Sequence, residues 1–335
     1  MKSIRQFEDL LNAEDFGDDH ARQSATDRQA RLTKPPGSLG RLEEIAVFLA
    51  GWQGDTIRAE NVQVLVFAGN HGVTRKGISP YPAEVTAQMV ANFKSGGAAI
   101  NALTQAFGLE LDVMALALDT PTGDISVEDA LDEQGFLTAL NTGFAAVRDG
   151  TDILVLGEMG IGNTTIAAAL CASVFGGTGL DWAGAGTGLD GAGISHKAAV
   201  IDQALARIGP HKLASFEYLR RLGGRELCAI AGAVLAARSR RIPVILDGFV
   251  VCAAVAPLFA HNPHSLAHCL AGHQSAERAH GKLLEIFGLD PLLDLGMRLG
   301  EGSGAALATA IVRAAVATHT RMATFENAGV TDRGP

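Results

Sequence analysis

The sequence is poor in aromatic residues and carries no excess of positive charge. Aromatic side chains make up 5% of its 335 residues, and the 27 Lys and Arg are outnumbered by 36 Asp and Glu, which gives a formal net charge of −9. An acidic chain argues against nucleic acid as a main partner. Any anionic substrate must therefore be held by local positive groups rather than by the field of the whole protein.

Long apolar runs are missing as well. The longest uncharged one, Gly248–Ala260, is too short to span a bilayer and contains Pro257, so we interpret it as a buried element and expect no membrane partner. The four cysteines lie far apart without a CxxC pair, which is typical of reduced core residues. The N-terminus shows no apolar signal segment. These features favour a cytoplasmic protein.

Short apolar segments alternate with Ala-rich helical patterns along most of the chain. Strands without polar alternation, separated by helices, are typical of a parallel sheet covered on both faces. We expect an α/β fold with a Rossmann-like parallel sheet of about six strands. The predicted strands are Val62–Ala68, Val113–Leu118, Ile153–Leu156, Val244–Leu246, Leu266–Ala271 and Leu292–Leu295, and the predicted helices include Val85–Leu103 and 303–325. Residues 60–302 are assigned to this α/β domain, and residues 1–59 together with 303–335 to a small helical domain from both chain ends.

The stretch Gly157–Thr165 joins a predicted strand to a predicted helix through a glycine-rich turn. Free N–H groups and the dipole at a helix start favour an anion there, and glycines let the backbone approach a phosphate. The spacing matches a P-loop, but Asn163 stands where the lysine would be. We predict a phosphate site without a nucleoside triphosphate; the alternative is a tight turn that binds nothing. A carboxylate at Glu158 suits a sugar hydroxyl or a base better than a phosphate.

Two further glycine-rich clusters follow. Ala183–Gly193 precedes Lys197, which could supply the positive charge missing at Asn163 or could be a solvated surface lysine. Glu301 lies alone among glycines in Gly300–Gly304, before a helix. Burial would raise its pKa toward neutrality and suit a general base, while a helix-capping glutamate is the alternative.

A proline-flanked loop carries Ser79 and Tyr81, with Gln88 beyond it, and could line a pocket for a flat aromatic ligand or be an ordinary ordered loop. Half of the ten histidines fall between His261 and His280. Their spacing lacks the carboxylate of a zinc motif, so we expect no metal there and place only His273 near the site. Ligands of parallel sheets bind at the carboxyl ends of the strands, where these clusters fall.

Taken together, the clusters resemble one enzyme family from about residue 30 to 325: nicotinate-nucleotide–dimethylbenzimidazole phosphoribosyltransferase, of cobalamin biosynthesis. The matching motifs are Lys34-Pro-Pro-Gly-Ser-Leu-Gly-Arg-Leu-Glu, Ala68-Gly-Asn-His-Gly-Val, Tyr81-Pro, Val85-Thr-Ala-Gln-Met, Gly96-Gly-Ala-Ala-Ile-Asn, Gly157-Glu-Met-Gly-Ile-Gly-Asn-Thr-Thr, Leu246-Asp-Gly-Phe, His273-Gln-Ser-Ala-Glu and Leu299-Gly-Glu-Gly-Ser-Gly-Ala. At one point the chain departs from the pattern: Gly272 stands where a serine is expected, which puts a hydroxyl contact there in doubt.

The resemblance implies that nicotinate mononucleotide gives its phosphoribosyl group to 5,6-dimethylbenzimidazole with inversion, forming α-ribazole 5′-phosphate and nicotinate. It implies a homodimer with shared active sites and no metal or organic cofactor. Glu301 would be the general base and Glu158 a secondary candidate. By the same resemblance the aromatic base is bound by Ser79, Tyr81 and Gln88, and the phosphoribosyl group by Gly160, Gly162, Asn163, Thr164, Gly186, Gly188 and Lys197. The other functions considered are a kinase or switch with a degenerate P-loop, which would bind ATP with Mg²⁺, and a sensor without turnover.

Overall fold

The computed structural model describes residues 1–332, and its centre is a six-stranded sheet in which all neighbouring strands are parallel. The strand order is β2-β1-β3-β4-β5-β6. The strands are β1 (Val62–Ala68), β2 (Glu110–Ala115), β3 (Ile153–Met159), β4 (Val244–Leu246), β5 (Cys269–His273) and β6 (Pro291–Leu293). The predicted α/β fold with a parallel sheet of about six strands is confirmed.

The two faces of the sheet are covered by separate helical layers, and the central strands supply both cores. Along β1, Val64 and Val66 face one core while Leu65 and Phe67 face the other. Every residue of this strand is buried, which explains why its sequence is apolar without alternation. A covered parallel sheet leaves only its strand ends for polar chemistry.

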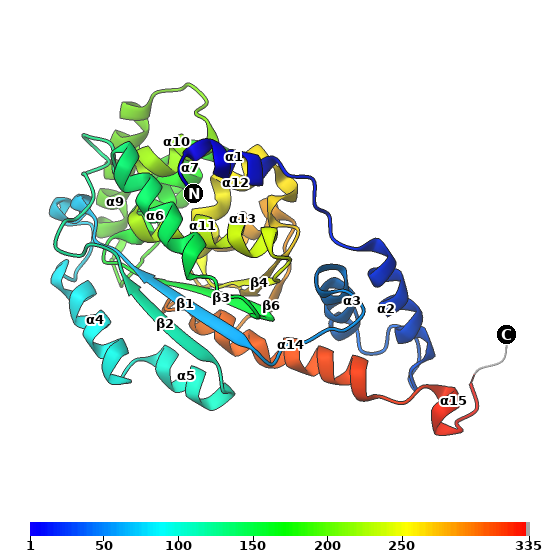
Figure 1. Ribbon diagram of the computed structural model, residues 1–335. Coiled ribbons are helices and arrows are strands. Elements are labelled where there is room, and N and C mark those ends of the chain that lie inside the picture. The colour runs from blue at the N-terminus through cyan, green and yellow to red at the C-terminus, as the bar shows by residue number, and fades with distance from the viewer. Residues whose placement is uncertain (333–335) are drawn as a thin grey trace.

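One layer contains the first helix and the helices of the middle of the chain, and the other contains the remaining early helices and the last long one (Figure 1). The first layer consists of α1 (Ile4–Asn12), α6 (Glu133–Ala146), α7 (Asn163–Phe175), α8 (Gly179–Trp182), α9 (Gly191–Ile208), α10 (Ser215–Leu222), α11 (Arg225–Ser239), α12 (Phe249–His261) and α13 (Arg278–Phe287). The second consists of α2 (Asp19–Arg31), α3 (Arg41–Gln53), α4 (Glu84–Ser95), α5 (Ala99–Phe107) and α14 (Ser303–Arg321). Short helices complete the fold: η1 (Gly72–Lys76), η2 (Pro263–Leu266) and α15 (Phe325–Ala328).

Several predicted boundaries differ from the structure. The single helix predicted over Val85–Leu103 is two helices, α4 and α5, because Gly96 ends α4 in the left-handed conformation (φ +81°). The strand predicted at Val113–Leu118 begins earlier, at Glu110, because polar residues of this edge strand are bound by Arg148 rather than buried. The predicted Leu266–Ala271 strand also runs later, through His273.

The two ends of the chain meet beside α14. Figure 1 shows α2, α3 and α15 gathered at one end of this long helix. A backbone bridge pairs Leu32 with Thr324, and Arg28 donates a hydrogen bond to the carbonyl of His319. Helix α1 instead packs on the first layer, where Phe7 meets Phe144 at a ring distance of 5.8 Å. The division into two domains remains a proposal, and the last three residues of its helical part, 333–335, lie outside the described residues.

The apolar run Gly248–Ala260 forms the buried helix α12, with Pro257 inside it. Across residues 1–332, no helix combines the length and the apolar character that crossing a membrane requires.

Candidate active site

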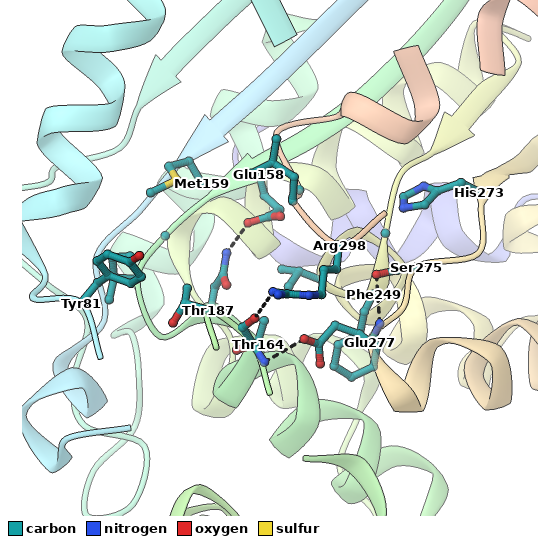
Figure 2. A pocket seen from close by; sticks show the side chains of 18 residues that line it. Tyr81, Glu158, Met159, Thr164, Thr187, Phe249, His273, Ser275, Glu277 and Arg298 are labelled. Carbon is teal, nitrogen blue, oxygen red and sulfur yellow. Dashed lines mark hydrogen bonds between the residues drawn. The ribbon is translucent and has the colours of Figure 1, made fainter. Parts of the chain in front are cut away.

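A cavity of about 290 Å³ opens at the carboxyl ends of β3, β4 and β5 (Figure 2). Its walls come from the turn between β3 and α7, the start of α12, the segment after β5 and the loop before α14. Of the predicted site residues, those that line it are Tyr81, Glu158, Gly160, Asn163, Thr164 and Gly186. The sheet therefore brings segments more than 200 residues apart to one place.

The turn from β3 into α7 exposes the start of a helix to this cavity. Gly162 caps the helix with φ +90°, a conformation that favours glycine, and Asn163 is the first helical residue. The side-chain amide of Asn163 donates a hydrogen bond to the Glu158 carboxyl. At the position where a P-loop has its phosphate-binding lysine, this chain therefore has an asparagine whose side chain orients the Glu158 carboxyl group.

Lys197 is 1% exposed, so it is not a solvated surface lysine. From α9 its ammonium group donates to the hydroxyl of Thr164 at 2.8 Å and to the carbonyl of Gly184 at 3.3 Å. A Cβ added at Gly186 would lie 3.3 Å from that ammonium nitrogen, so the backbone of Gly186 packs close to the cation. Burial lowers the pKa of Lys197 to about 8, although Glu277 opposes this shift. A positive group thus stands directly behind the first turn of α7.

Glu158, at the end of β3, is buried among other acidic groups. Burial, reinforced by the negative charges of Asp247 and Glu226, raises the pKa of Glu158 to about 8 despite the hydrogen bond from Asn163. At neutral pH this carboxyl is therefore mostly protonated and is able to donate a hydrogen bond into the cavity. Glu158 lines the cavity (Figure 2), and its carboxyl group accepts the hydrogen bond from Asn163.

Glu301 does not line the cavity, but it adjoins Gly300, which does. It is 4% exposed and has φ +63°, an unusual backbone conformation for a residue with a side chain. Its carboxylate accepts the N–H of Ile100 at 3.4 Å, at the start of α5. Burial raises the pKa of Glu301, with the N–H of Ile100 opposing the shift and the charge of Asp247 adding to it.

Asp247, not Glu301, accepts the free N–H groups at the start of α14. Its carboxylate receives those of Gly302 at 3.2 Å and Ala305 at 2.9 Å, and it lies 3.5 Å from Nδ1 of His273. Burial raises the pKa of Asp247, and these partners oppose that shift. Glu301 therefore does not cap α14, but its carboxylate accepts an N–H in the first turn of α5, so the helix-capping interpretation holds for a different helix.

Of the three residues predicted for the aromatic base, one lines the cavity and two do not. Tyr81 lines it and is 52% exposed. Ser79 lies behind the wall, 3.1 Å from the hydroxyl of Thr187, which does line it. Gln88 is exposed on α4 and does not line the cavity. Of the remaining predicted residues, Gly162 and Gly188 are outside the lining as well, and Gly188 has φ +117° in its loop.

Sequence reasoning missed Arg298, Glu277 and Phe249, all of which line the cavity. Arg298 donates to the carbonyl of Gly186 at 3.2 Å, and Glu277 accepts the N–H of Gly186 at 2.7 Å (Figure 2). A signal existed for both charged groups, because Glu277 ends the His273-Gln-Ser-Ala-Glu motif and Arg298 precedes Glu301 by three residues. Both hold the loop that carries Gly186.

The histidines between 261 and 280 do not converge. His273 lines the cavity, as expected, whereas His268 is buried against the carbonyl of Val234 and His261 bonds to Asn12. Burial lowers the pKa of His268 and of His280 to about 3, so both are neutral. Within the described residues no group of three or more His, Cys, Asp or Glu could hold a metal ion.

Gly272, the departure from the expected pattern, has a packing reason. A Cβ at this position would lie 2.7 Å from the Cα of Ala305 and 3.0 Å from a methyl group of Ile245. The residue therefore lets β5 approach the start of α14 closely. A serine here would require the helix or the strand to shift.

Comparisons with known proteins agree over nearly the whole chain. A family model described as phosphoribosyltransferase matches residues 15–330. The chain is 58% identical over 331 residues to the nicotinate-nucleotide–dimethylbenzimidazole phosphoribosyltransferase of Novosphingobium aromaticivorans, covering 98% of each chain. It is 56% identical to the enzyme of that name from Allorhizobium ampelinum, covering 95% of this chain and 93% of the relative. The crystal structure of CobT from Thermus thermophilus matches with a TM-score of 0.89 at 39% identity, covering 94% of this chain and all of the other.

Proposed function

The chain belongs to this phosphoribosyltransferase family and is an enzyme of that type, and on this premise we propose that it transfers the 5-phosphoribosyl group of nicotinate mononucleotide to 5,6-dimethylbenzimidazole. The products are α-ribazole 5′-phosphate and nicotinate, and the anomeric carbon inverts. The relatives that carry this name cover the chain almost completely, which supports the same substrate pair here.

The reaction requires the protein to position the two substrates and to supply one general base. The leaving group is a pyridinium, which departs as a neutral ring nitrogen, so no acid catalyst is required. The nucleophile is one nitrogen of the benzimidazole, and the N–H on its other nitrogen must lose a proton. We assign Glu301 as the base that accepts this proton, because burial raises the pKa of its carboxyl group toward the neutral pH at which a general base works best. Glu158 is the secondary candidate.

We assign the phosphate and ribose to the turn from β3 into α7. The free N–H groups at the start of α7, together with Arg298 and with Lys197 behind Thr164, supply local positive charge in a protein of net charge −9. A monophosphate needs neither a P-loop lysine nor Mg²⁺, which agrees with Asn163. The protonated Glu158 is suited to a ribose hydroxyl and does not repel the phosphate. Nothing observed favours a kinase or a switch.

The aromatic base would enter at the open rim beside Tyr81, with Ser79 and Gln88 as its further predicted contacts. Leu299 also lines the cavity and is 58% exposed, so two large apolar side chains, Tyr81 and Leu299, are exposed at this edge. We propose that a second copy of the chain closes this rim in a homodimer, because an exposed apolar edge of a site is typical of a contact surface. The four unpaired, buried cysteines support a cytoplasmic location.

The observation that carries the proposal is the fully buried Lys197 bonded to Thr164 behind the first turn of a helix that opens into the cavity. The direct experiment incubates the purified protein with nicotinate mononucleotide and dimethylbenzimidazole and measures released nicotinate. The configuration of the new glycosidic bond is then determined by NMR. We expect the α anomer, and turnover that chelators leave unchanged. Tight binding of the mononucleotide without nicotinate release would indicate a sensor, and Mg²⁺-dependent ATP binding would indicate a kinase or a switch.

A further inference from the structure

A buried contact between a histidine and a glutamate lies beneath the start of the turn from β3 into α7 and has no place in the chemistry described above. Nε2 of His71 is 2.6 Å from a carboxylate oxygen of Glu226, and both side chains are 0% exposed. His71 follows β1, and Glu226 is in the first turn of α11. Neither residue lines the cavity. Burying such a pair is costly, and replacing it with apolar residues is often neutral or stabilising, so a reason for keeping it must be sought.

Three glycines surround the pair, each where a side chain would collide with it. A Cβ at Gly69 would lie 2.2 Å from Glu226, and one at Gly224 would lie 2.4 Å from His71. A Cβ at Gly160 would lie 3.2 Å from Nε2 of His71, 3.3 Å from the Glu226 carboxylate and 2.7 Å from the carbonyl oxygen of Gly69. Gly160 begins the turn into α7, so the turn rests directly on the pair.

Backbone bonds connect two of these segments, the end of β1 and the turn after β3. The N–H of Gly69 bonds to the carbonyl of Met159 at 3.0 Å, just before the turn, and the N–H of Asn163 bonds to the carbonyl of Gly160 at 3.1 Å. Within residues 1–332, none of the ring nitrogens of His71 or the carboxyl oxygens of Glu226 has a hydrogen-bond partner, so the 2.6 Å approach of Nε2 to the Glu226 carboxyl is the polar contact on which each side chain depends. Losing one partner would leave a buried polar group uncompensated and would remove the packing that supports Gly160.

We infer that His71 and Glu226 are positioning residues: the pair supports Gly160 from below and so fixes where the turn Gly160–Asn163, and with it the mononucleotide site, lies relative to the sheet. The inference rests on the proposed function, since it takes this turn to bind the phosphoribosyl group. The pair acts through Gly160 and touches neither substrate. Its loss therefore weakens binding of the mononucleotide more than it slows the chemical step.

The test uses H71Q, E226Q and the double variant in the full-length protein. The matched control is H268Q, which alters an equally buried histidine that bonds to Val234 away from the cavity. We expect each single variant to raise the KM for nicotinate mononucleotide about tenfold, with kcat changed less than about threefold. Because the two residues act as one unit, the double variant is no worse than the worse single variant. H268Q loses thermal stability but keeps its KM.

A second variant covers the case in which the substitutions prevent folding. G224A displaces the pair without changing the cavity wall, because its methyl group would lie 2.4 Å from His71 and 2.8 Å from Glu226, and the φ of Gly224, −133°, is one that alanine adopts without strain. It is expected to raise the KM for the mononucleotide in the same way. A KM within twofold of wild type in folded H71Q, E226Q and G224A overturns the inference, as does an equal change in H268Q. Calorimetry with nicotinate mononucleotide separates the two failures: wild-type protein that does not bind it contradicts the proposed function, whereas unchanged binding by the variants contradicts the positioning role alone.

Discussion

Two groups of charged side chains in this protein are built in opposite ways. The Asp129 cluster, which consists of Asp129, Arg207, Arg220 and Arg221, joins the loop before α6 to α9 and α10. Asp129 lies 2.6 Å from Arg207, 3.1 Å from Arg220 and 3.0 Å from Arg221. Burial alone would raise the pKa of Asp129, but hydrogen bonds from Arg207 and Arg221 outweigh it and hold that pKa below its usual value. Here each charge stabilises its neighbours.

The site group, which consists of Glu158, Asp247 and Glu301 near the strand ends and Lys197 on α9, shows the reverse, and of these four residues only Glu158 lines the cavity. Burial raises the pKa of each of its three carboxyl groups and lowers that of Lys197. In every case the fold disfavours the charged form. Groups whose pKa is shifted by burial in a cavity are typical of functional sites, whereas matched ion pairs such as those of Asp129 are typical of structural ones. The direction of the pKa shift therefore separates charges that stabilise the fold, such as Asp129, from groups that are available to bind a ligand or exchange a proton.

The largest effect is expected for E301Q, which removes the proposed base while keeping the size of the side chain. Turnover should fall about 10²-fold or more, because a general base contributes roughly that much, with mononucleotide binding nearly unchanged. Steady-state kinetics and calorimetry measure the two quantities, with E285Q on the exposed face of α13 as the control. Near-normal turnover would remove Glu301 from this role and make Glu158 the next residue to test.

The next effect concerns Lys197. K197M should lower kcat/KM for the mononucleotide about 10²-fold, since losing a buried charge that faces an anion costs about 2–5 kcal/mol. Its folded pKa of about 8 lies below its usual value of 10.5, so the wild type loses stability relative to K197M as pH falls from about 10 to 7. Thermal unfolding at several pH values checks this sign, and K94M, on the exposed side of α4, is the control. A K197M protein that is unstable but fully active would place Lys197 with the structural charges.

Glu158 sharpens the comparison through the pH dependence of stability. Its folded pKa of about 8 lies above its usual value of 4.5, so its stabilising contribution is complete below 4.5 and is lost as pH rises toward 8. Across that range E158Q should gain about 1–3 kcal/mol in free energy of unfolding relative to the wild type. Urea unfolding of both proteins between pH 5 and pH 8 measures the difference. A constant difference across the range would mean that Glu158 is ionised in the folded protein.

The smallest effect is expected for D129N, and it should be purely structural. Breaking this network should lower the free energy of unfolding by about 1–3 kcal/mol, because three guanidinium groups lose their anionic partner. The kcat/KM value should stay within twofold of wild type. D149N is the matched control, since Asp149 is 98% exposed beside Arg240 and its loss should cost less than about 0.5 kcal/mol. A change in activity without a change in stability would reverse the assignment of the two groups.

Much of the site could be predicted because its parts are local in sequence. The turn at Gly160–Asn163 and the lone carboxylate at Glu301 each follow a predicted strand, and parallel strands bring their carboxyl ends together. Arg298 directly precedes the Leu299-Gly-Glu motif, but its role was missed because it follows from a bond to Gly186, 112 residues away. The boundaries of α4 and α5 were missed because one alanine-rich helical pattern runs across Gly96.

By itself the sequence determined the parallel α/β fold, the glycine turns at its strand ends and the family. These depend on hydrophobic periodicity and on short motifs, both of which can be recognised within a short segment of sequence. Only the tertiary structure decided which charges are suppressed and which are matched, because burial and the distance between charges arise from packing. Glu158 beside Asp247 and Glu226, Asp247 at the start of α14, and His71 beneath Gly160 are all pairs of residues far apart in the chain. Their energies exist only once the sheet has brought them together.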